Sequence, residues 1–496
     1  MIRDIYDKIK DGIDVRSNLS QLRKKLKEPN NRHALLYCIG TDSSVFTELL
    51  GHADAKTRKN VALVLGELGR NEYLEPLYEA YERETTLFVK SAYLLAMKQL
   101  NYSEYVEQFK QRIEKLNEMD LKEEEKKHIQ EEIRVLSSMI VDYEGIQPHS
   151  FRGYHEENQC VLLTNRNYMD VTLQQLNELD VDLMEAKTFN AGVLLKTNGL
   201  KEVMKIRTFQ ELLFMVPKMK VCKMDVQDAA STIVNADLLD FLSKRHKGKA
   251  PFYFRIEWKT KVDMEKRGIF TKKVASEIER LSKRQLINAP SNYEFEIRFI
   301  EAKDGRLNIL VKLYTLLDDR FQYRKEVVAT SIQPVNAALT VQLVKPYLKE
   351  NGQVLDPFCG VGTMLIERHK QVKANTMYAL DTFGQAIEKA KRNTLEAHQI
   401  IHYINRDFFD FKHEYLFDEI ITDMPFVIQG QQNEHIYQIY YRFFDKARQH
   451  LKENGVIILY SHDADYVRKL APMKGYRIRE EFELNRRQGT YVFVLQ

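Results

Sequence analysis

Four aspartates in the last third of the chain each stand after an apolar run, as a carboxylate does at the end of a buried strand. They are Asp356, Asp381, Asp407 and Asp423. Carboxylates accept hydrogen bonds from hydroxyl and amino groups, so they suit a ligand that is rich in such donors. A single aspartate of this kind is more often a cap or turn residue, but four in succession predict a ligand-binding pocket.

The glycines after the first aspartate predict a close approach of the backbone to that ligand. The sequence reads "DPFCGVGT" over residues 356–363. A phosphate-binding loop of the Walker type requires a lysine directly after its last glycine, but Gly362 is followed by Thr363. A dinucleotide-binding fingerprint requires a third glycine, where this chain has Leu365. Both mismatches argue against a pyrophosphate ligand.

The next two aspartates favour a nucleoside. Asp381 stands 25 residues after Asp356 and can accept both hydroxyls of a ribose, as the acidic residue of nucleotide-binding α/β domains does. Asp407 can accept from an adenine amine while the neighbouring Phe408 packs on the ring. A ribose, an adenine and a charged tail without phosphates describe S-adenosylmethionine, which we expect as the cofactor.

The fourth aspartate begins the stretch Asp423-Met424-Pro425-Phe426. It resembles the [Asn/Asp/Ser]-Pro-Pro-[Tyr/Phe] signature of methyltransferases that modify exocyclic amino nitrogens. The Asp423 carboxylate and the Met424 carbonyl can hold the two N–H groups of such an amine, while Phe426 stacks on the base. Pro425 fixes the turn. By itself the stretch could equally be a strand end followed by an ordinary X-Pro turn.

Positioning these residues requires a parallel sheet, because ligands of doubly wound folds bind at the carboxyl ends of the strands. Residues 331–496 alternate between strand and helix patterns, which predicts such a fold with seven strands. The last two strands should form a hairpin-like end. We expect the strands at residues 353–358, 376–381, 401–407, 417–424, 455–462, 475–484 and 489–496.

The preceding region, residues 158–325, has an α+β pattern with a small sheet. Its basic charge is concentrated between Phe241 and Pro290, where 14 Lys and Arg stand against 5 Asp and Glu. Four aromatic residues lie among these cations: Phe252, Tyr253, Phe254 and Trp258. Cations mixed with aromatics indicate a nucleic-acid-binding surface. A solvated helix face can supply about half of this charge, so that reading stays open.

The first 145 residues read as helical. Two helix patterns recur at a spacing of 32 residues, namely 58–68 with 90–100, and 73–84 with 105–116, and a shorter copy precedes them from Arg32. Paired helices at this period predict a short solenoid that resembles HEAT-like repeats, although a plain helical bundle remains the alternative. Residues 144–159 are the expected linker.

The composition is that of a globular protein. Hydrophobic residues make up 44% of the 496 residues and charged residues 29%, and no segment is apolar enough to predict a membrane span or a signal peptide. Four widely spaced cysteines argue against both a disulfide framework and a structural zinc site, so we expect no metal. Cytoplasm is the expected location.

With these motifs in hand, the chain resembles the THUMP-domain-containing class I S-adenosylmethionine-dependent methyltransferases that make N2-methylguanosine in RNA. The motifs "DPFCGVGTMLIE" and "TDMPF" carry the resemblance, together with the segment at 317–344. It implies four domains: a HEAT-like repeat at 1–145, a ferredoxin-like domain at 158–222, a THUMP domain at 223–325 and a Rossmann-fold methyltransferase domain at 331–496. It also implies a tRNA substrate, held by the acceptor stem and 3′ end.

The resemblance assigns roles by position. The methionine and ribose side of the cofactor should be lined by Asp356, Phe358, Gly360, Gly362 and Thr363. Asp381 should bind the ribose, and Asp407 with Phe408 the adenine, while Asp423, Met424, Pro425 and Phe426 form the amine-holding turn. RNA contacts are expected from Lys244, Arg245, Lys272, Lys273, Lys283 and Arg284.

Three alternatives remain. The enzyme could instead modify guanine N2 in ribosomal RNA, or the chain could be a non-catalytic RNA-binding scaffold. A DNA adenine methyltransferase is less favoured because no target-recognition region is evident. The helical repeat would add a binding arm for RNA or for a protein partner.

Overall fold

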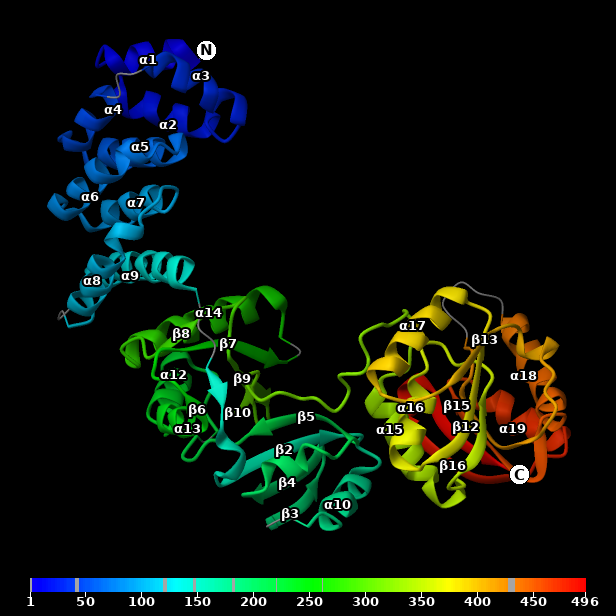
Figure 1. Cartoon of the computed structure of the whole chain (residues 1–496). Coiled ribbons are helices and arrows are strands. Elements are labelled where there is room, and N and C mark those ends of the chain that lie inside the picture. The colour runs from blue at the N-terminus through cyan, green and yellow to red at the C-terminus, as the bar shows by residue number, and fades with distance from the viewer. Residues whose placement is uncertain are drawn as a thin grey trace. The chain divides into compact units, whose positions relative to one another are not determined.

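The computed structural model describes residues 2–40, 44–118, 123–145, 149–180, 183–219, 221–260, 262–426 and 433–496. The chain divides into two compact units, residues 1–148 and 149–496 (Figure 1). The boundary falls within the stretch that the sequence predicts as a linker. Each unit is built around hydrophobic cores of its own.

The first unit is helical throughout its described residues. Its helices are α1 (Ile2–Lys10), α2 (Val15–Lys25), α3 (Pro29–Ile39), α4 (Ser44–Glu48), α5 (Ala55–Leu68), α6 (Leu74–Arg83), α7 (Leu87–Met97), α8 (Val106–Glu118) and α9 (Glu123–Glu144). Helices α5 and α7 begin 32 residues apart, as do α6 and α8, which is the predicted period.

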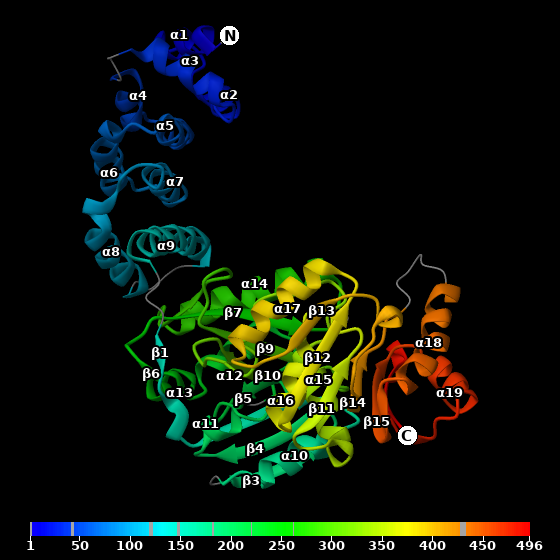
Figure 2. The ribbon, with the colours of Figure 1, turned by 45° about the vertical axis from the view of Figure 1, so that its right-hand side comes forward.

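Helices α2, α5, α7 and α9 form one row in which each packs on the next (Figure 2). The close contact between α5 and α7 depends on Gly66, since a Cβ at this position would lie 2.6 Å from the Cα of Ala96. The earlier copy differs from the prediction, because the helix that packs on α5 is α2 and lies upstream of Arg32.

The second unit contains an eight-stranded sheet with the order β3-β4-β2-β5-β10-β9-β7-β8. The elements of this part are β1 (Ser150–Phe151), β2 (Asn158–Thr164), α10 (Met169–Asn177), β3 (Leu183–Phe189), β4 (Gly192–Thr197), α11 (Leu200–Val203), β5 (Phe209–Phe214), α12 (Val226–Val234), α13 (Leu238–Arg245), β6 (His246–Lys247), β7 (Phe252–Lys259), α14 (Met264–Leu281), β8 (Leu286–Asn288), β9 (Phe295–Glu301) and β10 (Leu307–Leu313). The sequence predicts only a small sheet here. The sheet is larger because the ladder continues from β5 to β10 through the antiparallel pair Phe214 and Val311.

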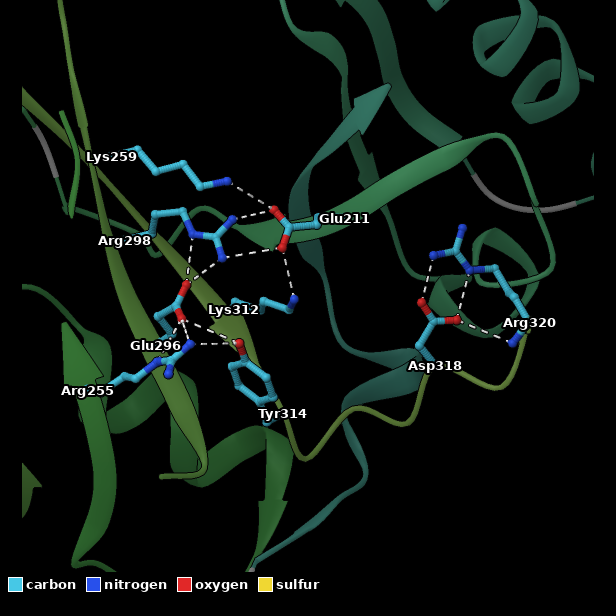
Figure 3. Close-up of polar contacts among 9 residues, drawn as sticks. All are labelled: Glu211, Arg255, Lys259, Glu296, Arg298, Lys312, Tyr314, Asp318 and Arg320. Atoms are coloured by element: carbon cyan, nitrogen blue, oxygen red, sulfur yellow. Dashed lines mark hydrogen bonds and ion pairs between the residues drawn. The ribbon is translucent and has the colours of Figure 1, made fainter. Parts of the chain in front are cut away.

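A charged network reinforces the junction between β5 and the following strands (Figure 3). The Glu211 carboxylate accepts from the Lys312 ammonium at 2.9 Å and pairs with Arg298, whose guanidinium also donates to Glu296. Arg255 donates to the same Glu296 from β7 at 2.7 Å. Although burial opposes it, hydrogen bonds from Arg298 and Lys312 lower the pKa of Glu211 to about 2. These cations are therefore bound within the sheet.

The linker prediction for this region needs correction. The expected linker is partly folded, because Ser150–Phe151 pairs with His246–Lys247 as a two-stranded sheet. Helices α12 and α13 are separated by a break at residues 235–237. Asn235 and Asp237 stand in that break, and both residue types favour caps and turns over helix interiors.

The last part of the unit forms a seven-stranded sheet with the order β13-β12-β11-β14-β15-β17-β16. Its elements are α15 (Pro334–Val344), β11 (Gly352–Asp356), α16 (Thr363–Gln371), β12 (Ala374–Asp381), α17 (Gly384–Glu396), β13 (His402–Asn405), β14 (Phe417–Asp423), α18 (Asn433–Arg448), β15 (Leu451–Ser461), α19 (Ala464–Met473), β16 (Ile478–Asn485) and β17 (Thr490–Leu495). The prediction of seven strands with an antiparallel end is confirmed, since β17 runs antiparallel to both β15 and β16.

Two layers of helices cover this sheet (Figure 1). Apolar residues of α15, α16 and α17 form the core on one face, and those of α18 and α19 form the core on the other. The order of strands reverses at β11, which pairs with β12 on one side and β14 on the other. Ligands of doubly wound sheets bind at this switch point, beside the carboxyl ends of the strands.

Candidate functional site

The carboxyl ends of β11 and β14 bring the buried Asp356 and the half-buried Asp423 to the switch point. Asp356 is 1% exposed, and its Oδ1 accepts hydrogen bonds from the Phe358 N–H at 3.1 Å and the Thr422 hydroxyl at 2.5 Å. Its Oδ2 is buried and accepts no hydrogen bond within the described part of the chain. Burial raises the pKa of Asp356 to about 7. A carboxyl in this state is ready to accept from a ligand.

The glycine loop after β11 is shaped by positive φ angles at both glycines. Gly360 has φ +53° with open space around it, whereas at Gly362, φ +82°, a Cβ would lie 2.1 Å from the Tyr403 hydroxyl. Asp381 spans this loop and the end of β12, since its carboxylate accepts from the Gly360 N–H at 2.9 Å and the Phe383 N–H at 2.8 Å. The Thr363 hydroxyl is buried without a partner among the described residues.

Asp423 ends β14 and begins the predicted amine-holding turn. Its Oδ1 is closed off from solvent and meets no hydrogen-bond donor among the described residues. Burial, and then the charge of Asp356, raise the pKa of Asp423 well above its usual range. Met424 is buried, and its N–H donates to the Tyr460 carbonyl at 2.8 Å, which fixes the turn against β15. Pro425 and Phe426 follow as half-buried residues.

Three residues that the sequence predictions omit surround this turn. The His462 ring lies 4.7 Å from the Phe426 ring, and its Nδ1 contacts the Thr490 hydroxyl at 2.9 Å. Burial lowers the pKa of His462, so its imidazole is neutral near neutral pH. Burial and the charge of Asp423 raise the pKa of Tyr460, and the Asn336 side chain opposes this shift. The sequence could have indicated Tyr460 and His462, because both stand at the end of a predicted strand.

Of the two expected adenine residues, Phe408 is placed differently from the prediction. Phe408 is 1% exposed and packs in the core against Phe443 at 5.9 Å, so its ring faces no ligand. Asp407 caps its own turn, since its Oδ1 accepts from the Phe409 N–H at 2.8 Å. The exposed aromatic residue beside the loop is instead Phe383, at 50% exposure.

The expected RNA-binding residues separate into two groups. Arg245 is buried and donates to Asn158 Oδ1 at 2.8 Å, and the Arg284 side chain is nearly buried beside Glu279, so neither guanidinium is available to a partner. Lys244 is exposed but pairs with its neighbour Asp240 at 2.7 Å. The remaining expected residues are exposed and have no carboxylate partner among the described residues: Lys272, Lys273 and Lys283.

The aromatics of the basic stretch belong mostly to the core. Phe252, Phe254 and Trp258 are each at most 3% exposed, because the alternation of β7 turns them toward α14. The idea of cations interleaved with available aromatics is therefore wrong for these three. Among the described residues, no helix has the length and apolarity needed to cross a membrane, and no cluster of histidine, cysteine and acidic side chains suits a metal ion.

Residues 322–491 match a protein-family model described as "RMKL-like, methyltransferase domain". No curated protein matches the chain. Among solved structures, the putative methyltransferase SMU.472 complexed with SAH is similar at 14% identity and a TM-score of 0.52, over 68% of this chain and 97% of that one.

A predicted N6-adenine-specific DNA methylase from Listeria monocytogenes matches at 15% identity and a TM-score of 0.52, over 68% of this chain and 96% of its own. A possible methylase from Clostridium difficile has 14% identity and the same TM-score, over 68% and 98%. At these identities the likeness concerns the fold, and it extends beyond the matched family domain.

The site suits the cofactor of that domain. The loop has no cation for a phosphate, and buried oxygen atoms of Asp356 and Thr363 have no partner in the described chain, so polar groups of a ligand can complete them. The Asp381 carboxylate already bridges the loop and β12, where it keeps lone pairs for ribose hydroxyls. Residues 322–491 are a class I methyltransferase domain, and its cofactor is S-adenosylmethionine.

Proposed function

We propose that the chain methylates the exocyclic N2 amine of a guanosine in tRNA, giving N2-methylguanosine. The observation that carries the proposal is Asp423, a carboxyl at the switch point whose buried Oδ1 accepts no hydrogen bond within the described chain. A buried acceptor without a donor is costly unless a ligand supplies one. An amine with two N–H groups is such a ligand.

In this proposal, different residues of the chain bind different parts of the cofactor. S-adenosylmethionine supplies an electrophilic methyl group when it is bound. In this proposal Asp381 accepts from the ribose, Gly360 and Gly362 leave room for the backbone to approach, and Asp356 and Phe358 line the methionine side. Phe383 takes the place of Phe408 against the adenine, because it is the exposed ring beside Asp381.

Asp423 and Met424 then position the target amine. The Asp423 carboxylate and the Met424 carbonyl accept its two N–H groups and direct the nitrogen lone pair toward the methyl group. Phe426 stacks on the base, and its contact with the His462 ring holds it in place. A strong base is unnecessary before transfer, since methylation acidifies the departing N–H.

Exposed cations of the preceding region support RNA as the substrate. Lys272 and Lys273 lie on α14 and Lys283 follows it, all three exposed. Cations of this kind contact phosphates and make binding dependent on salt. We propose that residues 158–222 are a ferredoxin-like domain, residues 223–325 a THUMP domain and residues 1–145 a HEAT-like repeat. We also propose that the protein holds the tRNA by its acceptor stem and 3′ end.

The decisive experiment measures methyl transfer from labelled S-adenosylmethionine to total tRNA and identifies the modified nucleoside by mass spectrometry. Wild-type protein should yield N2-methylguanosine. Asp423→Ala should lower the single-turnover rate by about 100-fold or more with little change in RNA affinity, since a mispositioned amine loses most of its reactivity. Charge reversal of Lys272 and Lys273 should weaken RNA binding and leave cofactor binding intact.

Parallel transfer assays with DNA and with ribosomal RNA test the alternative substrates. N6-methyladenosine in DNA would favour an adenine amine as the target, the specificity named for the Listeria monocytogenes protein. Transfer to ribosomal RNA alone would favour the ribosomal alternative. If the protein binds RNA but neither transfers a methyl group nor binds S-adenosylmethionine in calorimetry, the non-catalytic RNA-binding scaffold would be the favoured alternative.

A further inference from the structure

The first unit contains a groove where α2, α5 and α7 lie side by side in one row (Figure 2). Its volume is about 970 Å³, and side chains of all three helices line it. We call it the α2–α5 groove. The residues that decide its chemistry are Arg16, Arg23, Lys56, Lys59 and Phe88.

The groove is locally cationic although its unit is not. Residues 1–148 contain 23 Lys and Arg against 26 Asp and Glu, so a basic groove is no consequence of the average charge. Within the described chain, Arg16, Lys56 and Lys59 have no ion pair with a carboxylate. Two acids line the groove beside its four cations, namely the exposed Asp14 and the half-buried Asp54. Asp54 caps α5, where it accepts from the Thr57 N–H and hydroxyl at 2.9 and 2.7 Å, and the Thr57 hydroxyl and, less strongly, the charge of Arg16 lower its pKa.

One cation of the groove is held in place by a hydrogen bond, and the other three can contact a partner. Arg23 donates from Nη1 to Asn60 Oδ1 at 2.9 Å, which ties α2 to α5 across the groove. Arg16 and Lys56 are exposed, and Lys59 is half-buried. Three cations around one groove attract a polyanion.

An aromatic residue distinguishes between polyanions. Phe88 is half-buried in the groove, with the Lys59 ammonium 5.8 Å from its ring centroid and the His128 ring at 6.3 Å. By contrast Tyr73, Tyr81 and Tyr93 are fully buried in the core. A cationic groove with a reachable ring matches single-stranded nucleic acid, in which bases stack while phosphates contact cations. An acidic peptide would use only the cations.

We propose that the α2–α5 groove binds a single-stranded segment of RNA, with Arg16, Lys56 and Lys59 at phosphates and Phe88 against a base. The proposal rests on the proposed function in that RNA is the substrate. It gives the repeat unit a role in substrate capture, separate from the chemistry of the methyltransferase domain.

The test uses the full chain and a fluorescein-labelled oligouridylate of 12 nucleotides, followed by anisotropy over a series of salt concentrations. Lys56→Glu/Lys59→Glu should weaken binding at least tenfold and reduce the slope of log affinity against log salt by about 1.4, as expected for the loss of two phosphate contacts with a single strand. Phe88→Ala should weaken binding about tenfold with the slope unchanged. Lys10→Glu/Lys115→Glu, which reverses two exposed cations outside the groove, should bind as wild type.

Two outcomes overturn the proposal: equal binding by groove and control variants, or displacement of the oligouridylate more effectively by polyglutamate than by unlabelled RNA. Circular dichroism confirms that the variants are folded. Transfer assays separate this proposal from the proposed function. If wild type methylates tRNA, the groove variants should raise KM and keep kcat. Wild type that binds oligouridylate through the groove but methylates no RNA would contradict the proposed function alone.

Discussion

At the scale of single residues, the two carboxyls at the switch point differ in their hydrogen bonding. Asp356 has hydrogen bonds from Phe358 and Thr422, whereas Asp423 Oδ1 has none among the described residues. Burial disfavours the charged form of both carboxyls, and the hydrogen bonds to Asp356 offset this only in part, so both pKa values are raised. A ligand that donates hydrogen bonds reverses this effect, which makes the pair a sensitive reporter of binding.

The rate of methyl transfer should therefore depend on pH. An ionised Asp423 accepts more strongly than a neutral one, so the rate should rise with pH through an acid limb whose midpoint lies above 3.8, the ordinary value. Asp423→Asn keeps an acceptor oxygen but does not titrate. It should be about tenfold slower and lack that limb in single-turnover measurements at saturating cofactor. An unchanged acid limb in this variant would exclude Asp423 as its source.

The two glycines of the loop give a second residue-scale prediction. Gly360→Ala should cost about 1 kcal/mol in the free energy of unfolding, from its φ of +53° alone. Gly362→Ala should cost about 2–5 kcal/mol, because the Tyr403 hydroxyl must also move and lose its 2.7 Å contact with Thr394. Urea unfolding followed by circular dichroism measures both.

Tyr403→Phe provides the matched control. In the Gly362→Ala background it removes the atom that the new Cβ meets, so part of the lost stability should return. Equal costs at Gly360 and Gly362 would show that the contact with Tyr403 is unimportant.

The sequence predicted the polar residues of the site better than it predicted which aromatic rings are exposed there. The aspartates could be found because each ends an apolar run, and strand ends are visible in a sequence. Phe408 and Phe409 are adjacent, and only the geometry of their short turn decides that Phe408 enters the core. Phe383 carries no sequence signal beyond its place two residues after Asp381.

At the scale of elements, α16 connects the glycine loop to the preceding region. Arg207 precedes β5 and donates to both carboxylate oxygens of Glu367 at 2.7 Å, and the Tyr323 hydroxyl donates to the same carboxylate at 2.7 Å. The Glu367 side chain is fully buried. This bidentate pair holds the helix that follows the cofactor loop.

Removing Arg207 should be costly. Arg207→Ala leaves the Glu367 charge buried with a single hydroxyl donor and should lower the free energy of unfolding by about 3–5 kcal/mol. Arg392→Ala is the control, since its pair with Glu326 at 2.8 Å is exposed and should contribute less than about 1 kcal/mol. Similar losses in chemical denaturation for the two variants would contradict a structural role for Arg207.

Element-scale prediction succeeded where the pattern was long and periodic. The seven strands of the last sheet were all expected, because apolar runs alternate there with amphipathic helices. The sheet before it is larger than the small sheet expected. Its edge strands β3 and β8 bury too little to show a clear pattern in the sequence. The single pair that joins β5 to β10 involves residues far apart in sequence, which no local pattern records.

At the scale of the whole molecule, the two units have separate hydrophobic cores. Segments with cores of their own usually fold alone. We therefore expect a fragment of residues 149–496 to be folded and to bind S-adenosylmethionine as the full chain does. Without the α2–α5 groove it should bind tRNA at least tenfold more weakly.

Calorimetry with the cofactor and anisotropy with labelled tRNA check the two expectations separately. Loss of cofactor binding by the fragment would contradict the independence of the second unit. Unchanged tRNA affinity would contradict a contribution from the repeat. Mixing the separate units tests whether the contribution requires covalent linkage.

Next to Glu367 on α16 stands Arg368, which is fully buried and pairs with the equally buried Glu419 of β14 through two nitrogens. Neither charge can be replaced alone without leaving the other unpaired in the core. In related chains the two positions should therefore change together, either to another opposite pair or to two apolar residues. Covariation at these two positions would therefore identify related chains even where their loops and substrates have diverged.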